Sequence, residues 1–230
     1  MYSSEMVDWW VGRSLSYDYQ EAYTNIAKIF PSDFRIFLDV GCGTGEVLKK
    51  IWRPYDKKTY LGTDASPKMI EIARCNLEKS GIPVKWISCI EDLSNEGEVN
   101  LLLDDISKSK IPNFFADLTS FTFPGIVHLY GESSSEEFYA IKGSILRETV
   151  KKTKFRGRHL WVDYDVNSES QDEEKNSSSL RKKITKALGL KMKSFNFFEN
   201  SSLWSDSNID NSLNPGEKSG YGAVLSQRIK

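Results

Sequence analysis

This chain of 230 residues has little of several residue types that often announce a function. It contains two histidines and three cysteines. The cysteines, Cys42, Cys75 and Cys89, are odd in number and lack metal-ligand spacing, so we predict no metal site and interpret them as reduced thiols. Lysine and arginine number 31 against 32 acidic residues, a balance that signals neither nucleic acid nor an anionic membrane as a partner.

Long apolar runs are missing as well. No stretch approaches the roughly 20 apolar residues that span a bilayer. The N-terminal MYSSEMVDWW lacks the basic and then apolar pattern of a signal peptide. We therefore expect a soluble, cytoplasmic protein with no membrane partner. With 39% hydrophobic residues the chain can bury one substantial core, and we predict a single domain over 1–230. Its oligomeric state is not indicated.

The most informative segment is Ile36 to Ile51, IFLDVGCGTGEVLKKI. An apolar strand is followed by three closely spaced glycines and then by a helix, and Asp64 ends the next strand. The glycines allow a tight turn against which a ligand can lie, and the helix start offers unpaired N–H groups. An acid about 20 residues further on can accept hydrogen bonds from a ribose, so the pattern predicts a nucleoside-containing cofactor.

The spacing narrows the choice of cofactor. Glu46 stands where the dinucleotide fingerprint requires a third small residue, and its carboxylate would repel a pyrophosphate. This disfavours NAD. A phosphate-binding P-loop is excluded because no Lys-Ser/Thr pair follows the glycines.

These residues resemble the first motif of the class I S-adenosylmethionine-dependent methyltransferases, LDVGCGTG. The resemblance continues through Asp64-Ala65-Ser66-Pro67, where Ser66 is a suitable helix cap and Pro67 a suitable first helical residue. Further along, 154–158 (KFRGR) is similar to the turn before the family's fifth strand. The resemblance covers roughly residues 34 to 164. It implies S-adenosylmethionine as the cofactor, which carries no phosphate.

The family resemblance implies an α/β fold, a doubly wound and mostly parallel seven-stranded sheet with helices on both faces. The implied strand order is 3-2-1-4-5-7-6, with the last strand antiparallel. For the fourth strand, residues 99–106 and 116–123 compete, and we favour the second. We then expect 95–115 to be a partly helical insertion, and 167–180 and 206–220 to be polar loops.

By the same resemblance, the cofactor is expected to lie against the glycine turn, the end of the second strand, the adenine-edge motif after the third strand, and the fourth strand. Asp39 is either a support near the cofactor's amino-acid end or a buried structural acid. The predicted cofactor-binding residues are Asp39, Gly41, Cys42, Gly43, Thr44, Gly45, Asp64, Ala65, Ser66, Met69, Ile90, Glu91, Ser120 and Phe121.

An aromatic segment precedes these motifs. Residues 1–30 are expected to form a helical lid over the cofactor and substrate, although the same aromatic rings suit ordinary packing. Trp10, Arg13, Tyr17 and Tyr19 are its candidate site residues, with Tyr17 or Tyr19 the best match to a cofactor-contacting tyrosine of the family.

The acceptor is less clearly encoded. His128 follows the favoured fourth strand and fits either a catalytic base or a structural histidine. The aromatic segment favours a small-molecule acceptor. A basic cluster from Arg147 to Arg158 fits either a solvated surface or an RNA-binding one. We therefore predict a small-molecule methyltransferase, with an RNA or protein methyltransferase as one alternative and a catalytically inactive nucleoside-binding partner subunit as another.

Overall fold

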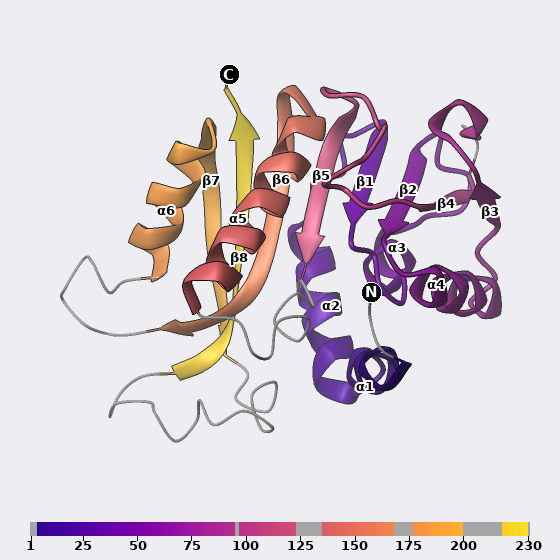
Figure 1. Ribbon diagram of the computed structural model, residues 1–230, viewed down its shortest axis with the longest axis horizontal. Helices are drawn as coiled ribbons and strands as arrows, with labels where there is room; N and C mark the ends of the chain where they lie inside the picture. The colour runs from indigo at the N-terminus through magenta and orange to yellow at the C-terminus, as the bar shows by residue number, and fades with distance from the viewer. Residues whose placement is uncertain (1–3, 95–96, 123–134, 168–176, 200–217, 230) are drawn as a thin grey trace.

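The computed structural model describes residues 4–94, 97–122, 135–167, 177–199 and 218–229. Over these ranges the chain forms one eight-stranded sheet with helices on both faces (Figure 1). The helices are α1 (Ser4–Ser14), α2 (Tyr17–Ile29), α3 (Glu46–Ile51), α4 (Pro67–Lys79), α5 (Ser135–Lys152) and α6 (Ser177–Ala187). The strands are β1 (Ile36–Val40), β2 (Thr59–Asp64), β3 (Val84–Ile87), β4 (Val99–Leu103), β5 (Ala116–Thr122), β6 (Thr153–Asn167), β7 (Leu190–Glu199) and β8 (Lys218–Arg228).

The strand order is β3-β4-β2-β1-β5-β6-β8-β7. Strands β1 to β6 pair in parallel, and β8 pairs antiparallel with both β6 and β7. This arrangement confirms the predicted doubly wound α/β fold and its antiparallel last strand. The described residues contain eight strands rather than seven, because one extra strand lies between the predicted third and second.

The extra strand is β4, which falls inside the segment predicted to be a partly helical insertion. That prediction was wrong for Val99–Leu103. Four of its five residues are buried between β3 and β2, and the one polar residue, Asn100, donates from its amide to the Tyr60 carbonyl oxygen (3.2 Å). A satisfied asparagine can therefore occupy a buried strand. The other candidate segment forms β5 beside β1, the place expected of the fourth strand.

Two cores lie on the two faces of the sheet. Phe37 and Leu38 are neighbours in β1 whose side chains point to opposite faces, as strand geometry requires. Phe37 packs with residues of α3 and α4, and Leu38 packs with residues of α5. Helices α5 and α6 cover one face, and α2, α3 and α4 cover the other (Figure 1).

Close packing beneath the glycine turn requires a glycine in β2. A Cβ atom at Gly62 would stand 2.6 Å from Leu48 Cδ1 of α3, so a side chain there would force the helix away from the sheet. The predicted start of α4 is confirmed. Ser66 is its N-cap, with its hydroxyl accepting a hydrogen bond from the Met69 N–H (3.3 Å), and Pro67 opens the helix.

The predicted polar loops fall mostly outside the described residues. The last residues of the first loop, 177–180, instead begin helix α6. Within the described ranges, no helix combines the length and apolarity that crossing a membrane requires.

Candidate functional site

The site is built around the turn between β1 and α3. Gly41, Gly43 and Gly45 all have left-handed backbone conformations, with φ of 66°, 52° and 80°. Glycine adopts this conformation without the steric cost that other residues incur. A Cβ atom at Gly45 would come within 3.3 Å of Ala73 on α4, so the third glycine allows close helix packing. A Cβ atom at Gly43 would meet nothing within 4 Å, so the turn is open beside the second glycine.

Asp64, at the end of β2, holds the turn in place. Its Oδ2 accepts a hydrogen bond from the Gly43 N–H (3.0 Å), and its Oδ1 accepts one from the Ser66 N–H (2.9 Å). Burial raises the pKa of the Asp64 carboxyl to about 6, against the lowering effect of these backbone hydrogen bonds. Each carboxylate oxygen has a second lone pair, so Asp64 can hold the turn and also accept hydrogen bonds from ligand hydroxyls.

Asp39 lies behind the turn, in β1. The Ser120 hydroxyl donates to its Oδ1, while Oδ2 is buried with no hydrogen-bond partner. The pKa of Asp39 is raised to about 7, mainly by burial and to a smaller extent by the charge of Asp64, against the lowering effect of the Ser120 hydrogen bond. Ser120 and Phe121 are themselves buried, so they support Asp39 and the glycine turn from below.

A third acid, Glu46, opens helix α3. Its side chain is 1% exposed and lies 3.6 Å from the Lys49 ammonium, and neither carboxylate oxygen accepts a hydrogen bond. The pKa of Tyr23 on α2 is raised mainly by burial and next by Tyr19. The charges of Glu46 and Asp39 raise it to a smaller extent. Glu46 and Asp39 therefore both lie near Tyr23 of helix α2.

A fourth acid was missed by the sequence reasoning. Asp104 directly follows β4, and its backbone N–H donates to the carbonyl oxygen of Asp64 (3.0 Å). Its Oδ2 is buried with no hydrogen-bond partner. The signal was present in the sequence as an apolar run, VNLLL, closed by an acid, the same pattern that identified Asp64.

The predicted adenine-edge residues follow a different strand from Asp104. Ile90 and Glu91 lie in a short 3₁₀ helix after β3, and β4 separates β3 from β2. Glu91 is exposed to solvent. The acid next to Asp64 is therefore Asp104, and Ile90 and Glu91 follow a strand that lies one position further out.

Other predicted cofactor residues lie around these acids. Ala65 is exposed beside Asp64, while Cys42, Thr44, Ser66 and Met69 are buried. Burial of Cys42 raises its thiol pKa well above the usual range. These buried side chains shape the turn and the start of α4 rather than facing solvent.

The N-terminal helices meet at the carboxyl edge of the sheet, where α1 lies across the end of the molecule near α4 (Figure 1). Trp10 and Tyr19 are buried in a core that includes Met69, Leu160 and Tyr221. The guanidinium of Arg13 lies 4.7 Å from the Trp9 ring centroid and 5.5 Å from that of Tyr19.

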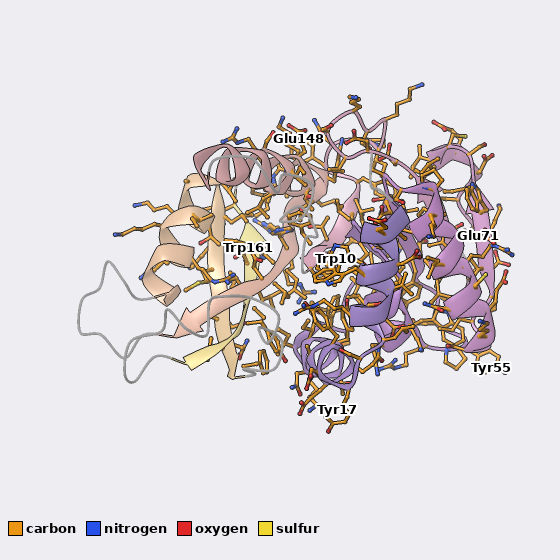
Figure 2. The ribbon with its side chains drawn as sticks, turned by 60° about the horizontal axis from the view of Figure 1, so that its bottom comes forward. Trp10, Tyr17, Tyr55, Glu71, Glu148 and Trp161 are labelled. Carbon is orange, nitrogen blue, oxygen red and sulfur yellow. The ribbon has the colours of Figure 1, made fainter. Side chains whose placement is uncertain are left out.

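The two candidate tyrosines therefore differ. Tyr17 is 80% exposed and lies at the outer rim in Figure 2, whereas Trp10 points toward the middle of the molecule. Tyr19 is 1% exposed and packs edge to face with Trp10. Tyr19 therefore packs inside the protein, and Tyr17 faces solvent. Both belong to the segment that was predicted to form a lid.

Of the two histidines, only His159 lies within the described residues. His128 lies outside the described residues. His159 is buried in β6, where its Nδ1 lies 2.7 Å from the Thr119 hydroxyl, and burial lowers its pKa to about 3. A histidine held neutral inside the sheet suits a structural role.

Together these acids define the electrostatics of the site. Asp39, Glu46, Asp64 and Asp104 surround one glycine turn, and three of them have buried carboxylate oxygens without a hydrogen-bond partner. Burying charged oxygens without partners is unfavourable, so a bound group with positive charge and N–H or O–H donors would be stabilised here. A sulfonium nucleoside with an ammonium group has these features, and a pyrophosphate has the opposite charge.

Comparison with known proteins gives an independent finding. Residues 37–118, which include the glycine turn and all four acids, match the family model described as "Methyltransferase domain". No curated protein matches the chain.

Three solved structures show the same fold at low sequence identity. A SAM-dependent methyltransferase of Methanosarcina mazei is 12% identical with a TM-score of 0.55, and the match covers 89% of this chain and 97% of that one. Magnesium protoporphyrin IX methyltransferase of Synechocystis, with bound SAM, is 12% identical with a TM-score of 0.53, covering 92% and 80%. The [4+2]-cyclase SpnF is 15% identical with a TM-score of 0.58, covering 91% and 80%.

Proposed function

We propose that this chain, which belongs to the class I S-adenosylmethionine-dependent methyltransferases, transfers the methyl group to a small-molecule acceptor. The observation that carries the proposal is the set of buried acids around the glycine turn, with acceptor oxygens left for a cationic nucleoside. The acceptor class rests on the apolar, aromatic character of helix α1.

Each acid has a role in this proposal. Asp64 accepts hydrogen bonds from the ribose hydroxyls while it holds the Gly43 N–H. Asp104, beside it, accepts from the adenine amino group. Asp39 and Glu46 lie toward the amino-acid end, where their negative charge favours an ammonium group.

The bound cofactor supplies an electrophilic methyl group on a sulfonium, which needs no metal to activate it. The protein's part is to align the acceptor and exclude water. Holding a nucleophile in line with the sulfur–methyl bond can by itself lower the barrier by several kcal/mol. Helix α1, with Trp10 in its buried face, is placed to close the carboxyl edge against solvent.

His128 remains the proposed base for a hydroxyl or amine acceptor. It follows β5, and β5 ends beside β1 at the carboxyl edge. The neutral imidazole of a histidine can accept the proton that the acceptor loses. A carboxylate or thiolate acceptor would not need it.

Support for a small acceptor also comes from proteins of the same fold. Two of them are named as a magnesium protoporphyrin IX methyltransferase and a mitomycin 7-O-methyltransferase. The cyclase SpnF shows that the fold also serves another reaction, so the acceptor must be identified by experiment.

The test is to incubate the purified protein with methyl-labelled S-adenosylmethionine and either a metabolite extract or total RNA. We expect label in one or a few small molecules by mass spectrometry, and loss of that label in Asp64→Ala. Label in RNA or protein alone would reject the small-molecule acceptor. Tight cofactor binding with no labelled product in any fraction would reject turnover.

A further inference from the structure

A second cavity lies at the amino edge of the sheet, opposite the glycine turn. It has a volume of about 620 Å³, within the range of small-ligand sites. It forms where β1, β5 and β6 begin and where β8 ends, so its walls come from strands that are far apart in the sequence. None of the residues assigned above to the cofactor site lines it.

The cavity is strongly basic. Its lining includes five cationic side chains, Arg35, Lys154, Arg156, Arg158 and Lys193, against the two acids Asp33 and Asp117.

Both acids are already engaged. Asp117 pairs with Lys154 (2.7 Å) and accepts the backbone N–H groups of Arg35 and Ile36, and Asp33 pairs with Arg158. Across the described ranges, no ion pair is formed by the side chains of the other three cations. In a chain with a formal net charge of −1, this leaves a local excess of positive charge facing the cavity.

Two of the cationic residues, Lys154 and Arg156, lie in a bulge of β6. Between β5 and β6 the pairing passes from Ala116–Thr153 directly to Leu118–Arg158, so residues 154–157 bulge out of the sheet. A Cβ atom at Gly157 would stand 2.9 Å from the carbonyl oxygens of Asp117 and Lys154, so only glycine fits there. The Gln227 side chain donates to the Arg156 carbonyl oxygen (3.0 Å) and anchors the bulge from β8.

The bulge presents two complementary groups. Phe155 is 56% exposed although it lines the cavity, and the guanidinium of Arg156 lies 5.6 Å from its ring centroid. Arg156 has a φ of 62°, a conformation that arginine rarely adopts. Guanidinium groups bind phosphates through paired hydrogen bonds, and an exposed aromatic ring beside cations is the usual platform for stacking a base.

We propose that the amino-edge cavity binds a nucleotide, with the phosphate held by Arg35, Arg156 and Lys193 and the base stacked on Phe155. The nucleotide is either free or one residue of a single-stranded RNA, because both present the same phosphate and base. The site is separate from the cofactor site and does not depend on the acceptor proposed above.

The test uses the full chain saturated with S-adenosylhomocysteine, so that the probes cannot enter the cofactor site. The probes are uridine 5′-monophosphate, followed by calorimetry, and a fluorescein-labelled oligouridylate of about ten residues, followed by anisotropy. We expect both to bind, and the affinity of the oligouridylate to fall with rising salt with a log–log slope of about −0.7 for each phosphate that the cations neutralise.

The key variant is Arg156→Gly, which removes the guanidinium at a backbone conformation that glycine adopts readily. We expect it to weaken binding of both probes about tenfold or more. Arg147→Ala is the matched control, since Arg147 is an exposed arginine that does not line the cavity. It should stay within about twofold of the original affinity, and both variants should bind the cofactor normally.

The two sources of the nucleotide give different results. Oligouridylate that binds more than about tenfold tighter than the mononucleotide identifies an RNA strand, and similar affinities identify a free nucleotide. Absence of binding by both probes at about 10 mM mononucleotide and 0.1 mM oligouridylate overturns the proposal, as does equal affinity of Arg156→Gly and Arg147→Ala. Unchanged affinity in Phe155→Ala overturns the stacking of the base. None of these results depends on methyl transfer, so they are independent of the test of the proposed function.

Discussion

The two edges of the sheet in this chain carry opposite charge and are built differently. At the carboxyl edge, four acids surround a glycine turn, and three of them have buried oxygens without a hydrogen-bond partner. At the amino edge, the acids are paired or bonded to backbone N–H groups, and unpaired cations are exposed. The chain is nearly neutral as a whole, so its net charge hides both regions.

The difference shows that acidic and basic residues that balance in number can be concentrated at opposite edges of the folded sheet. Buried groups at the carboxyl edge interact with a ligand at low effective dielectric, whereas exposed groups at the amino edge are screened by water and salt. We therefore expect substitutions at the carboxyl edge to have the larger effects.

Asp64→Ala should have the largest effect on cofactor binding. It removes an acceptor for the ribose and also releases the Gly43 and Ser66 N–H groups that the carboxylate holds. We expect S-adenosylmethionine affinity to fall by roughly 1–3 kcal/mol, the usual value of charge-assisted hydrogen bonds. Isothermal calorimetry measures the change, and unchanged affinity would reject the ribose assignment.

The second-largest effect should be the pH dependence of cofactor affinity. Cofactor binding requires ionised acids, and the pKa of Asp64 in the ligand-free chain is about 6. Affinity should therefore rise about tenfold from pH 5 to pH 8, with proton release visible as different binding enthalpies in buffers of different ionisation enthalpy.

The stability of the ligand-free chain should change with pH in the opposite direction. The pKa values of Asp64 and Asp39 are raised from 3.8 to about 6 and about 7, so folding favours their protonated forms. This contribution to stability is complete below about pH 4 and is lost as the pH rises through 6 and 7. Thermal unfolding measured over this pH range checks the prediction. An unfolding temperature and a cofactor affinity that both stay constant with pH would contradict the assignment of these acids to the site.

Asp104→Ala should have a smaller effect, and it distinguishes the acid proposed here to bind adenine, Asp104, from the one predicted from the sequence, Glu91. We expect cofactor affinity to fall by roughly 0.5–1.5 kcal/mol, the net value of one hydrogen bond. Glu91→Ala is the control, because Glu91 is exposed and follows the edge strand β3. If Glu91→Ala weakened binding more than Asp104→Ala, the adenine contact would belong to Glu91 and the role proposed for Asp104 would be rejected.

Lys154→Ala, at the amino edge, should have the smallest effect. Its ammonium pairs with Asp117 at 2.7 Å, but the side chain is 39% exposed, and exposed ion pairs contribute about 0–1 kcal/mol. Chemical denaturation should show a loss of stability within that range, with cofactor affinity unchanged. A loss of cofactor affinity comparable to that of Asp64→Ala would show that the two edges are coupled.

Local patterns in the sequence predicted the glycine turn, its acid and the start of α4. The reason is that these features depend on neighbours in the chain. Three glycines are needed because their own φ angles are positive, and Ser66 caps α4 through a residue three positions away. The order of the predicted strands was also confirmed, since parallel strands joined by helices have few possible arrangements.

The sequence was less informative where segments far apart in the chain could occupy the same position in the sheet. Val84–Ile87 and Val99–Leu103 both form strands, and only the tertiary structure decides that Val99–Leu103 lies beside β2. Asp104, rather than Glu91, therefore lies next to Asp64. The same limit applies to Tyr17 and Tyr19, which lie two positions apart on one helix and differ in exposure because only Tyr19 meets Trp10.

A strand, a glycine turn, a helix and an acid that form one nucleoside-binding unit can be recognised in the sequence, because short-range backbone geometry dictates that unit. Which acids gather around the turn, and where the cations gather, follows instead from the folded sheet. Burial and charge proximity depend on which strands become neighbours, and residues as far apart as Arg35, Lys193 and Gln227 meet only when the sheet has formed.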